Sequence, residues 1–339
     1  MNTLPKTALA ALLSLSLSSV TCAAAPDSLM GYSEGAQVFS VTPVTFRVQT
    51  ISDIIYRQVY SRNGVRGLKM TLLKPETQGL KPTLIYFPGG GFTSAARDKY
   101  TELRHALAKA GFVVAAIEYR TVPDRYPALV EDAKAAIRYL RAHATELSID
   151  RERIGVFGDS AGGYLAEMVA MTNGESGFDV GDNLNESSEV QAAVSFYGIS
   201  DLLTIGEGLG DEIASVHQSK AVTEALLING MAFDTFKGAS VFDTPEKARE
   251  ASPLSHVDGN EPPLLLLHGA KDTLVSPLQS KKLYEALKAQ GADAEYILLS
   301  NAGHGDLPWY QDVIVNKVVD FFKKRLQLIT PVLNDGRVL

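Results

Sequence analysis

Six runs of consecutive apolar residues recur along the middle and the end of the chain, separated by longer polar and mixed segments. The runs are continuous rather than alternating, which is typical of strands that are buried on both faces of a parallel sheet. We therefore expect six buried strands, at residues 83–87, 112–119, 154–158, 190–196, 263–268 and 295–299.

The segments between these runs show the spacing of amphipathic helices. In residues 128–144 the apolar side chains recur at intervals of three and four, which places them on one helical face. Alternating strands and helices predict an α/β fold, with a mostly parallel, doubly wound sheet, right-handed crossovers and helices on both faces. Residues 44–75 alternate more strictly between apolar and polar positions, which favours an antiparallel start to this sheet. The other expected helices lie at residues 99–110, 161–171, 277–290 and 311–326.

Residues 200–252 interrupt the alternation, because they separate two expected strands by more than a simple crossover needs. The segment contains one helical pattern, at residues 219–231. We interpret it as a cap insertion that folds over the carboxyl edge of the sheet. The chain from residue 26 to residue 339 is then one domain with a small cap.

Residues 1–25 have the layout of a secretory signal peptide. Lys6 is followed by an apolar and Ser-rich run and then by small residues at the end of the segment. The run is too short to span a bilayer, which needs about 20 residues. Cleavage of this segment would remove Cys22, the single cysteine, so the mature chain would have no disulfide and no thiol nucleophile. These features predict a periplasmic or secreted protein.

The amino-acid composition argues against a disordered chain and against a nucleic-acid-binding protein. The 339 residues are 45% hydrophobic and 21% charged, which is typical of a folded globular chain and not of a disordered one. A net charge of −7 argues against nucleic-acid partners, because binding to a phosphate backbone needs an excess of cations. Elsewhere in the sequence no apolar run is long enough for stable membrane insertion. The sequence gives no indication of oligomeric state.

The segment with the clearest chemistry is Gly158-Asp159-Ser160-Ala161-Gly162. A buried strand is expected directly before this G-x-S-x-G motif and a helix directly after it, which is the setting of a nucleophile elbow. The small residues allow a tight turn that exposes the Ser160 hydroxyl. The amino end of the helix then faces the reacting atoms with its free N–H groups.

A serine nucleophile needs a base and an acid that orients the base. In the α/β-hydrolase chain order these residues follow the serine as Asp or Glu and then His. Asp272 and His304 fit this order, since each comes just after an expected strand, at the carboxyl edge where open α/β sheets carry their sites. The remaining histidines are interpreted as structural, although His268 could contact the site from behind; they are His105, His143, His217, His256 and His268.

A glycine run, Gly89-Gly90-Gly91, follows Pro88 at the end of the first buried strand. Acyl transfer places negative charge on a carbonyl oxygen, and preorganised N–H groups must stabilise it. Glycines allow the backbone to approach that oxygen closely. The N–H groups of Gly90, Gly91 and Ala161 are therefore the candidate oxyanion-hole donors.

Taken together, these motifs resemble the α/β-hydrolase superfamily, specifically bacterial esterases related to hormone-sensitive lipase and to the feruloyl and acetylxylan esterase-like group. The likeness covers about residues 65–327. It implies Ser160 as nucleophile, His304 as base and Asp272 as its partner, with no metal and no cofactor. One position departs from the family, because Pro88 stands where H-G-G-G motifs have histidine. Further positions match the family in a structural role; they are Tyr119, Arg120 and Asp132.

The resemblance predicts a secreted serine carboxylesterase that acts on short-chain acyl esters or on acetyl or feruloyl esters of carbohydrates. The expected partner is thus a small-molecule or polysaccharide-linked ester. Three alternatives stay open at this point. A serine peptidase of the prolyl-oligopeptidase type shares the fold and the order of the triad, and a non-catalytic binding protein could use the same scaffold. A lipid hydrolase is also open, since the cap contains apolar runs.

Overall fold

The computed structural model describes residues 29–43, 45–61 and 64–327. The predicted signal peptide, residues 1–25, and Cys22 within it lie outside the described residues. The chain divides into two compact units, residues 1–45 and residues 46–339. The described part of the first unit contains turns but neither helix nor strand.

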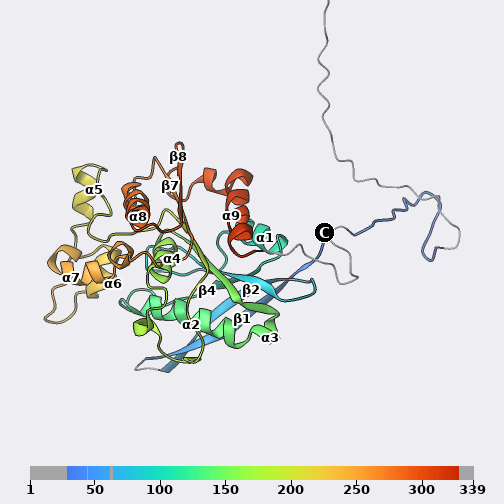
Figure 1. The fold of residues 1–339 in the computed structure, drawn as a ribbon, viewed down its shortest axis with the longest axis horizontal. Helices are drawn as coiled ribbons and strands as arrows, with labels where there is room; N and C mark the ends of the chain where they lie inside the picture. Colours follow the sequence, from blue (N-terminus) through green and yellow to red (C-terminus); the bar gives the residue numbers. More distant parts are fainter. Residues whose placement is uncertain (1–28, 44, 62–63, 328–339) are drawn as a thin grey trace, which may run out of the picture. The chain divides into compact units, whose positions relative to one another are not determined.

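The second unit is organised around one sheet whose strand order is β1-β2-β4-β3-β5-β6-β7-β8 (Figure 1). Strands β3 to β8 pair in parallel, while β2 pairs antiparallel with both β1 and β4. The predicted α/β fold with an antiparallel start is thereby confirmed. The strands are β1 Val48–Ser61, β2 Gly64–Pro75, β3 Lys81–Phe87, β4 Val113–Ile117, β5 Ile149–Asp159, β6 Ala192–Phe196, β7 Leu264–Gly269 and β8 Ala294–Leu299.

Every residue of the central strands β3, β4, β6 and β7 is buried, as their continuous apolar sequences predict. The expectation of a buried strand at residues 295–299 is wrong, because β8 lies at the edge of the sheet and is only partly buried. Helices cover both faces of the sheet. The apolar sides of α2, α4 and α8 join one core cluster, and those of α1 and α9 join a second cluster on the opposite face. The helices are α1 Thr101–Lys109, α2 Ala128–Ala142, α3 Ala144–Leu147, α4 Ala161–Met171, α8 Leu278–Ala289 and α9 Asp312–Arg325.

The segment between β6 and β7 contains the residues predicted to form a cap. It holds α5 Asp211–Val216, α6 Thr223–Asn229 and α7 Pro245–Glu250, which Figure 1 shows in yellow and orange. The helix expected at residues 219–231 is shorter than predicted. Val222 has an extended backbone, and Gly230 leaves the helix with φ 82°, a conformation that glycine adopts without strain. The 3₁₀ helices of the described chain are Ser176–Phe178, Val241–Asp243, Pro253–His256 and Leu307–Tyr310.

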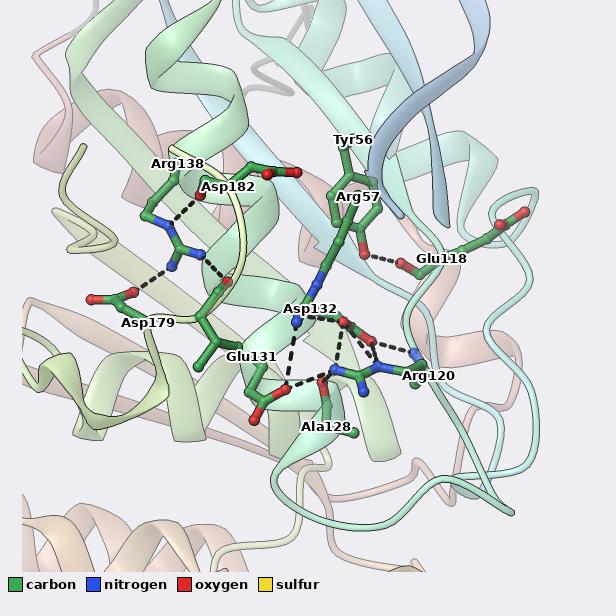
Figure 2. Close-up of polar contacts among 11 residues, drawn as sticks. Tyr56, Arg57, Glu118, Arg120, Ala128, Glu131, Asp132, Arg138, Asp179 and Asp182 are labelled. Atoms are coloured by element: carbon green, nitrogen blue, oxygen red, sulfur yellow. Dashed lines mark hydrogen bonds and ion pairs between the residues drawn. The ribbon is translucent and has the colours of Figure 1, made fainter. Parts of the chain in front are cut away.

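A buried ionic network ties the edge strand β1 to the helical layer (Figure 2). Arg57 of β1 donates a 2.6 Å hydrogen bond to Asp132 of α2, whose side chain is fully buried. Arg120, just after β4, donates to both oxygens of the same carboxylate and to Glu131. Asp132 thus holds two guanidinium groups from two different elements, consistent with the structural role expected for Arg120 and Asp132.

Candidate active site

The G-x-S-x-G motif forms a sharp turn between β5 and α4. Ser160 has φ 55° and ψ −119°, a conformation that residues with a side chain rarely adopt. The residues two positions before and two positions after it have to be glycine. A Cβ at Gly158 would lie 2.1 Å from the Gly162 carbonyl oxygen, and a Cβ at Gly162 would lie 1.9 Å from the Phe87 carbonyl oxygen. The two glycines therefore allow the tight turn that places Ser160 at its tip, where the hydroxyl is accessible.

The structure brings together the three side chains that the sequence selects as nucleophile, base and acid. The Oγ atom of Ser160 lies 2.8 Å from Nε2 of His304. The opposite ring nitrogen, Nδ1, lies 2.7 Å from Oδ2 of Asp272. Both distances are normal hydrogen-bond lengths, so the three groups form a continuous hydrogen-bonded chain. All three follow the carboxyl ends of strands, at one edge of the sheet.

Asp272 is fixed in its orientation by groups other than His304. Its Oδ1 atom accepts hydrogen bonds of 2.9 Å from the N–H groups of Leu274 and Val275. Burial by itself would raise the pKa of this carboxyl. The hydrogen bonds from His268, His304 and the Val275 N–H outweigh burial and hold the pKa of Asp272 well below its usual range. Asp272 is therefore ionised at neutral pH, as a group that orients an imidazole has to be.

His268 contacts Asp272 from the buried side of the site, an arrangement that the sequence allowed. Its ring is fully buried at the end of β7, with Nε2 3.4 Å from Oδ2 of Asp272. Nδ1 lies 2.8 Å from the Ser280 hydroxyl, and Nε2 lies 3.1 Å from the Val275 carbonyl oxygen. The ring therefore packs against the buried side of Asp272.

The remaining histidines lie elsewhere. His105 is exposed on α1. His143 stacks on the ring of Tyr139. Nδ1 of His217 lies 2.6 Å from Glu224 within the segment between β6 and β7. Nε2 of His256 lies 2.7 Å from the Glu250 carbonyl oxygen.

The glycine run follows β3 and lies beside the serine. Gly89 does not offer its N–H to the site, because that group donates a 2.8 Å hydrogen bond to Asp159. The N–H groups of Gly90, Gly91 and Ala161 have no hydrogen-bond partner among the described residues. Gly91 has φ 56°, so a glycine is suited to this position. The three predicted oxyanion donors thus lie near the serine with free N–H groups.

Hydrogen bonds hold this loop in place although Pro88 replaces the usual histidine. The hydroxyl of Tyr119 donates a 2.5 Å hydrogen bond to the Pro88 carbonyl oxygen. Asp159 accepts from the Gly89 N–H and, at 2.6 Å, from the Tyr86 hydroxyl. Burial raises the pKa of Asp159, and these two hydrogen bonds oppose that rise. Asp159, the first x position of the G-x-S-x-G motif, therefore holds the glycine run through the N–H group of Gly89.

A cavity of about 450 Å³ opens at Ser160 and His304. Its walls include Lys99, whose ammonium group donates a 2.7 Å hydrogen bond to the Gly89 carbonyl oxygen. The Tyr197 ring lies 4.6 Å from the imidazole of His304, centroid to centroid. Sequence reasoning did not select these wall residues, because they come from distant segments and no short motif connects them; they are Lys99, Tyr100, Tyr197, Leu274 and Tyr310.

The arrangement of Ser160, His304 and Asp272 agrees with the protein family that the sequence matches. Residues 70–287, more than half of the chain, match the family model BD-FAE. The chain belongs to the BD-FAE family. The matched region includes Ser160, Asp272 and the glycine run, and it ends before His304.

Curated relatives of this BD-FAE family member carry esterase names. The probable carboxylic ester hydrolase LipM of Mycobacterium tuberculosis is 29% identical over 212 residues, which cover 62% of this chain and 46% of LipM. Esterase LipC of the same organism is 29% identical over 228 residues, covering 66% of this chain and 53% of LipC. The chain spans about half the length of these relatives.

Solved structures show the same architecture. A truncated carbohydrate esterase from gut microbiota superposes with a TM-score of 0.70 at 26% identity, covering 84% of this chain and 98% of that one. Butyrate-bound esterase 2 of Thermogutta terrifontis gives a TM-score of 0.62 at 25% identity, covering 84% and 94%. The predicted resemblance to esterases of the α/β-hydrolase superfamily is thereby confirmed. In the described part of the chain, no helix combines the length and the apolar character that crossing a bilayer requires.

Proposed function

We propose that this chain is a serine carboxylesterase in which Ser160 is the nucleophile, His304 the general base and Asp272 its orienting acid. The observation that carries the proposal is the continuous hydrogen-bonded chain from Ser160 through His304 to Asp272, with distances of 2.8 and 2.7 Å. The esterase names of its relatives support the same reaction class. These residues supply the nucleophile, the general base and the orienting carboxylate that acyl transfer through a covalent acyl-enzyme requires.

The reaction proceeds in two halves. His304 takes the proton from Ser160 as the hydroxyl oxygen attacks the ester carbonyl, and the resulting oxyanion accepts hydrogen bonds from Gly90, Gly91 and Ala161. His304 then gives the proton to the leaving alcohol, which departs and leaves an acyl group on Ser160. Water attacks this acyl-enzyme with His304 again acting as base, and His304 then returns the proton to the Ser160 oxygen as the acid product is released.

The substrate that we propose is a short-chain acyl ester or an acetyl or feruloyl ester on a carbohydrate. A cavity of about 450 Å³ is toward the small end of the usual range of about 300–1,000 Å³ for ligand pockets, which suits a compact acyl group. One similar structure is a carbohydrate esterase and another holds butyrate. The bound butyrate supports a small acid component, and the carbohydrate esterase supports a carbohydrate alcohol.

Replacement of the nucleophile tests the reaction class. Ser160→Ala is expected to abolish hydrolysis of phenyl acetate, since the remaining site cannot form an acyl-enzyme. A fluorophosphonate probe should label the wild-type chain at Ser160 and should not label the variant. The control is an unchanged thermal unfolding midpoint. A folded Ser160→Ala variant that keeps most of its activity would refute the assignment.

A panel of esters tests the substrate class. We expect a higher kcat/KM for acetyl and propionyl esters than for octanoyl esters of the same alcohol. Acetylated xylan and methyl ferulate distinguish the two carbohydrate-linked acyl groups. A clear preference for octanoyl esters would contradict the short-chain proposal and favour a lipid substrate.

We also propose that residues 1–25 direct export of the chain and are then removed. The support is the order of Lys6, an apolar run and small residues, as in secretory signal peptides. Amino-terminal sequencing of the protein recovered outside the cytoplasm should begin within residues 24–26. Recovery of the chain with Met1 still attached would contradict this proposal.

A further inference from the structure

A second cavity, larger than the one at Ser160, lies at the same edge of the sheet. It has a volume of about 560 Å³ and is lined by the carboxyl end of β1, the start of β2, the loop after β4 and Gly181 with Asp182. The directions of the strands show which edge of the sheet this cavity occupies. Strand β1 is antiparallel to β2 and β2 is antiparallel to β4, so β1 and β4 run in the same direction. Their carboxyl ends therefore lie at the edge where Ser160 follows β5.

The loop after β4 joins this second cavity to the glycine run. Thr121 and Val122 line the cavity. The N–H of Val122 donates a 2.8 Å hydrogen bond to the Phe92 carbonyl oxygen, directly after the glycine run. The hydroxyl of Thr121 lies 3.4 Å from the Thr93 carbonyl oxygen. A ligand in the second cavity would thus rest on a loop that is hydrogen-bonded to the segment directly after the glycine run.

The charges around the second cavity do not favour an ionic ligand. Three guanidinium groups face it, but two of them, those of Arg57 and Arg120, are already paired with Glu131 and Asp132 (Figure 2). Two further carboxylates, of Asp124 and Asp182, also line it. Guanidinium and carboxylate charges therefore roughly balance, so neither an anion nor a cation gains a net attraction.

The cavity instead offers hydrogen-bond donors and acceptors beside an aromatic ring. Within the described residues, the side chains of Gln58, Arg66, Asp124 and Asp182 make no hydrogen bond or ion pair. Gln58 supplies both donors and an acceptor, Arg66 supplies donors, and the two carboxylates supply acceptors. The ring of Tyr60 is 79% exposed at the wall. A flat apolar face surrounded by hydrogen-bonding groups of both kinds matches a sugar ring.

We propose that this second cavity binds a saccharide unit of the polymer that carries the ester, at a distance from the unit being deacylated. The inference rests on the proposed function, because it assumes a carbohydrate-linked ester as substrate. Tyr60 would stack on one sugar face, while Gln58, Asp124 and Asp182 would bond its hydroxyl groups. A short model ester would leave this cavity empty, whereas an oligosaccharide ester would gain affinity from it.

Binding of ester-free oligosaccharides tests the proposal directly. The full chain is titrated with xylohexaose, cellohexaose and mannohexaose, and binding is followed by ligand-observed NMR. We expect saturable binding of at least one hexaose, and we expect Tyr60→Ala to weaken it by about tenfold. The matched control is Leu298→Ala on β8, an exposed apolar residue (51%) at the opposite edge of the sheet, which should bind like the wild type. Absence of saturable binding, or equal binding by Tyr60→Ala, would overturn the proposal.

Hydrolysis of phenyl acetate separates this proposal from the proposed function. Tyr60→Ala should hydrolyse phenyl acetate at the wild-type rate and show a raised KM only for an acetylated xylo-oligosaccharide. A loss of phenyl acetate hydrolysis in Tyr60→Ala would overturn the binding role, because the residue would then act through the candidate active site. Failure of the proposed function itself would appear differently, as wild-type protein without any Ser160-dependent hydrolysis of phenyl acetate.

Discussion

Glu167 is a buried carboxyl group whose titration should limit the stability of this protein at alkaline pH. It lies on α4, the helix that follows Ser160, and none of its surface is exposed. Oε1 accepts a 2.7 Å hydrogen bond from the Ser195 hydroxyl, whereas Oε2 has no partner among the described residues. Burial raises the pKa of Glu167 from 4.5 to about 8, and the Ser195 hydrogen bond offsets only part of that rise. The folded protein therefore holds this carboxyl protonated at neutral pH.

The sign of the effect follows from linkage. Between pH 4.5 and about 8 the unfolded chain releases the Glu167 proton while the folded protein keeps it. The unfolded state is thus stabilised progressively, and the free energy of unfolding falls by about 1.4 kcal/mol for each pH unit. Over the whole interval the loss amounts to about 5 kcal/mol, a large share of the usual 5–15 kcal/mol. Below pH 4.5 this penalty is absent, and above about pH 8 it is constant.

Glu167→Gln removes the titration and nearly preserves the shape of the side chain. The difference in unfolding free energy, variant minus wild type, should rise by several kcal/mol between pH 5 and pH 8, as measured by urea unfolding. An unsatisfied amide in the variant would cost about 1–3 kcal/mol, but equally at every pH. Glu246→Gln is the matched control, because that side chain is 91% exposed and its difference should stay flat. A flat difference for Glu167→Gln as well would refute the reasoning.

Three further variants test the packing around the site. Gly162→Ala should abolish ester hydrolysis, because its Cβ would lie 1.9 Å from a backbone oxygen, whereas Gly177→Ala, with nothing within 4 Å, should keep wild-type kcat. His268→Gln should lower kcat by about tenfold with KM unchanged, since His268 only supports Asp272; an unchanged kcat would exclude this role. Asp132→Asn should cost about 3–5 kcal/mol in urea unfolding, because two partly buried guanidinium groups lose the buried carboxylate that they share, and Asp124→Asn should cost far less.

The candidate catalytic residues could be predicted because local sequence determines where they lie. The small residues around Ser160 are required by backbone contacts of about 2 Å, so the turn leaves a recognisable motif. Asp272 follows the buried strand β7 and His304 follows the edge strand β8, and parallel pairing brings the ends of these strands to one edge. The chain order and the strand pattern together were therefore enough to place three distant side chains in contact.

Other parts of the molecule left no comparable signal in the sequence. The walls of the cavity at Ser160 come from separate segments, and their proximity depends on tertiary packing that no short pattern records. In the segment between β6 and β7, α5 and α7 have six residues each, too few for a clear helical period. Glu167 was visible as a single carboxylate in the apolar sequence AGGYLAEMVAM, but helical periodicity does not reveal whether such a residue faces solvent or core.

The proline in place of the usual histidine has a physical explanation in the way the glycine run is held. Three contacts fix the loop from different directions: the Tyr119 hydroxyl on the Pro88 carbonyl, Asp159 on the Gly89 N–H, and the Val122 N–H on the Phe92 carbonyl. The first contact uses only the carbonyl oxygen of residue 88, so the N–H that proline lacks is not needed there. The pyrrolidine ring of Pro88 also restricts φ at the point where the loop leaves β3. Less conformational entropy is therefore lost when the loop becomes ordered. A loop fixed in this way keeps the Gly90 and Gly91 N–H groups oriented before substrate arrives, and electrostatic stabilisation of an oxyanion depends on such preorganisation.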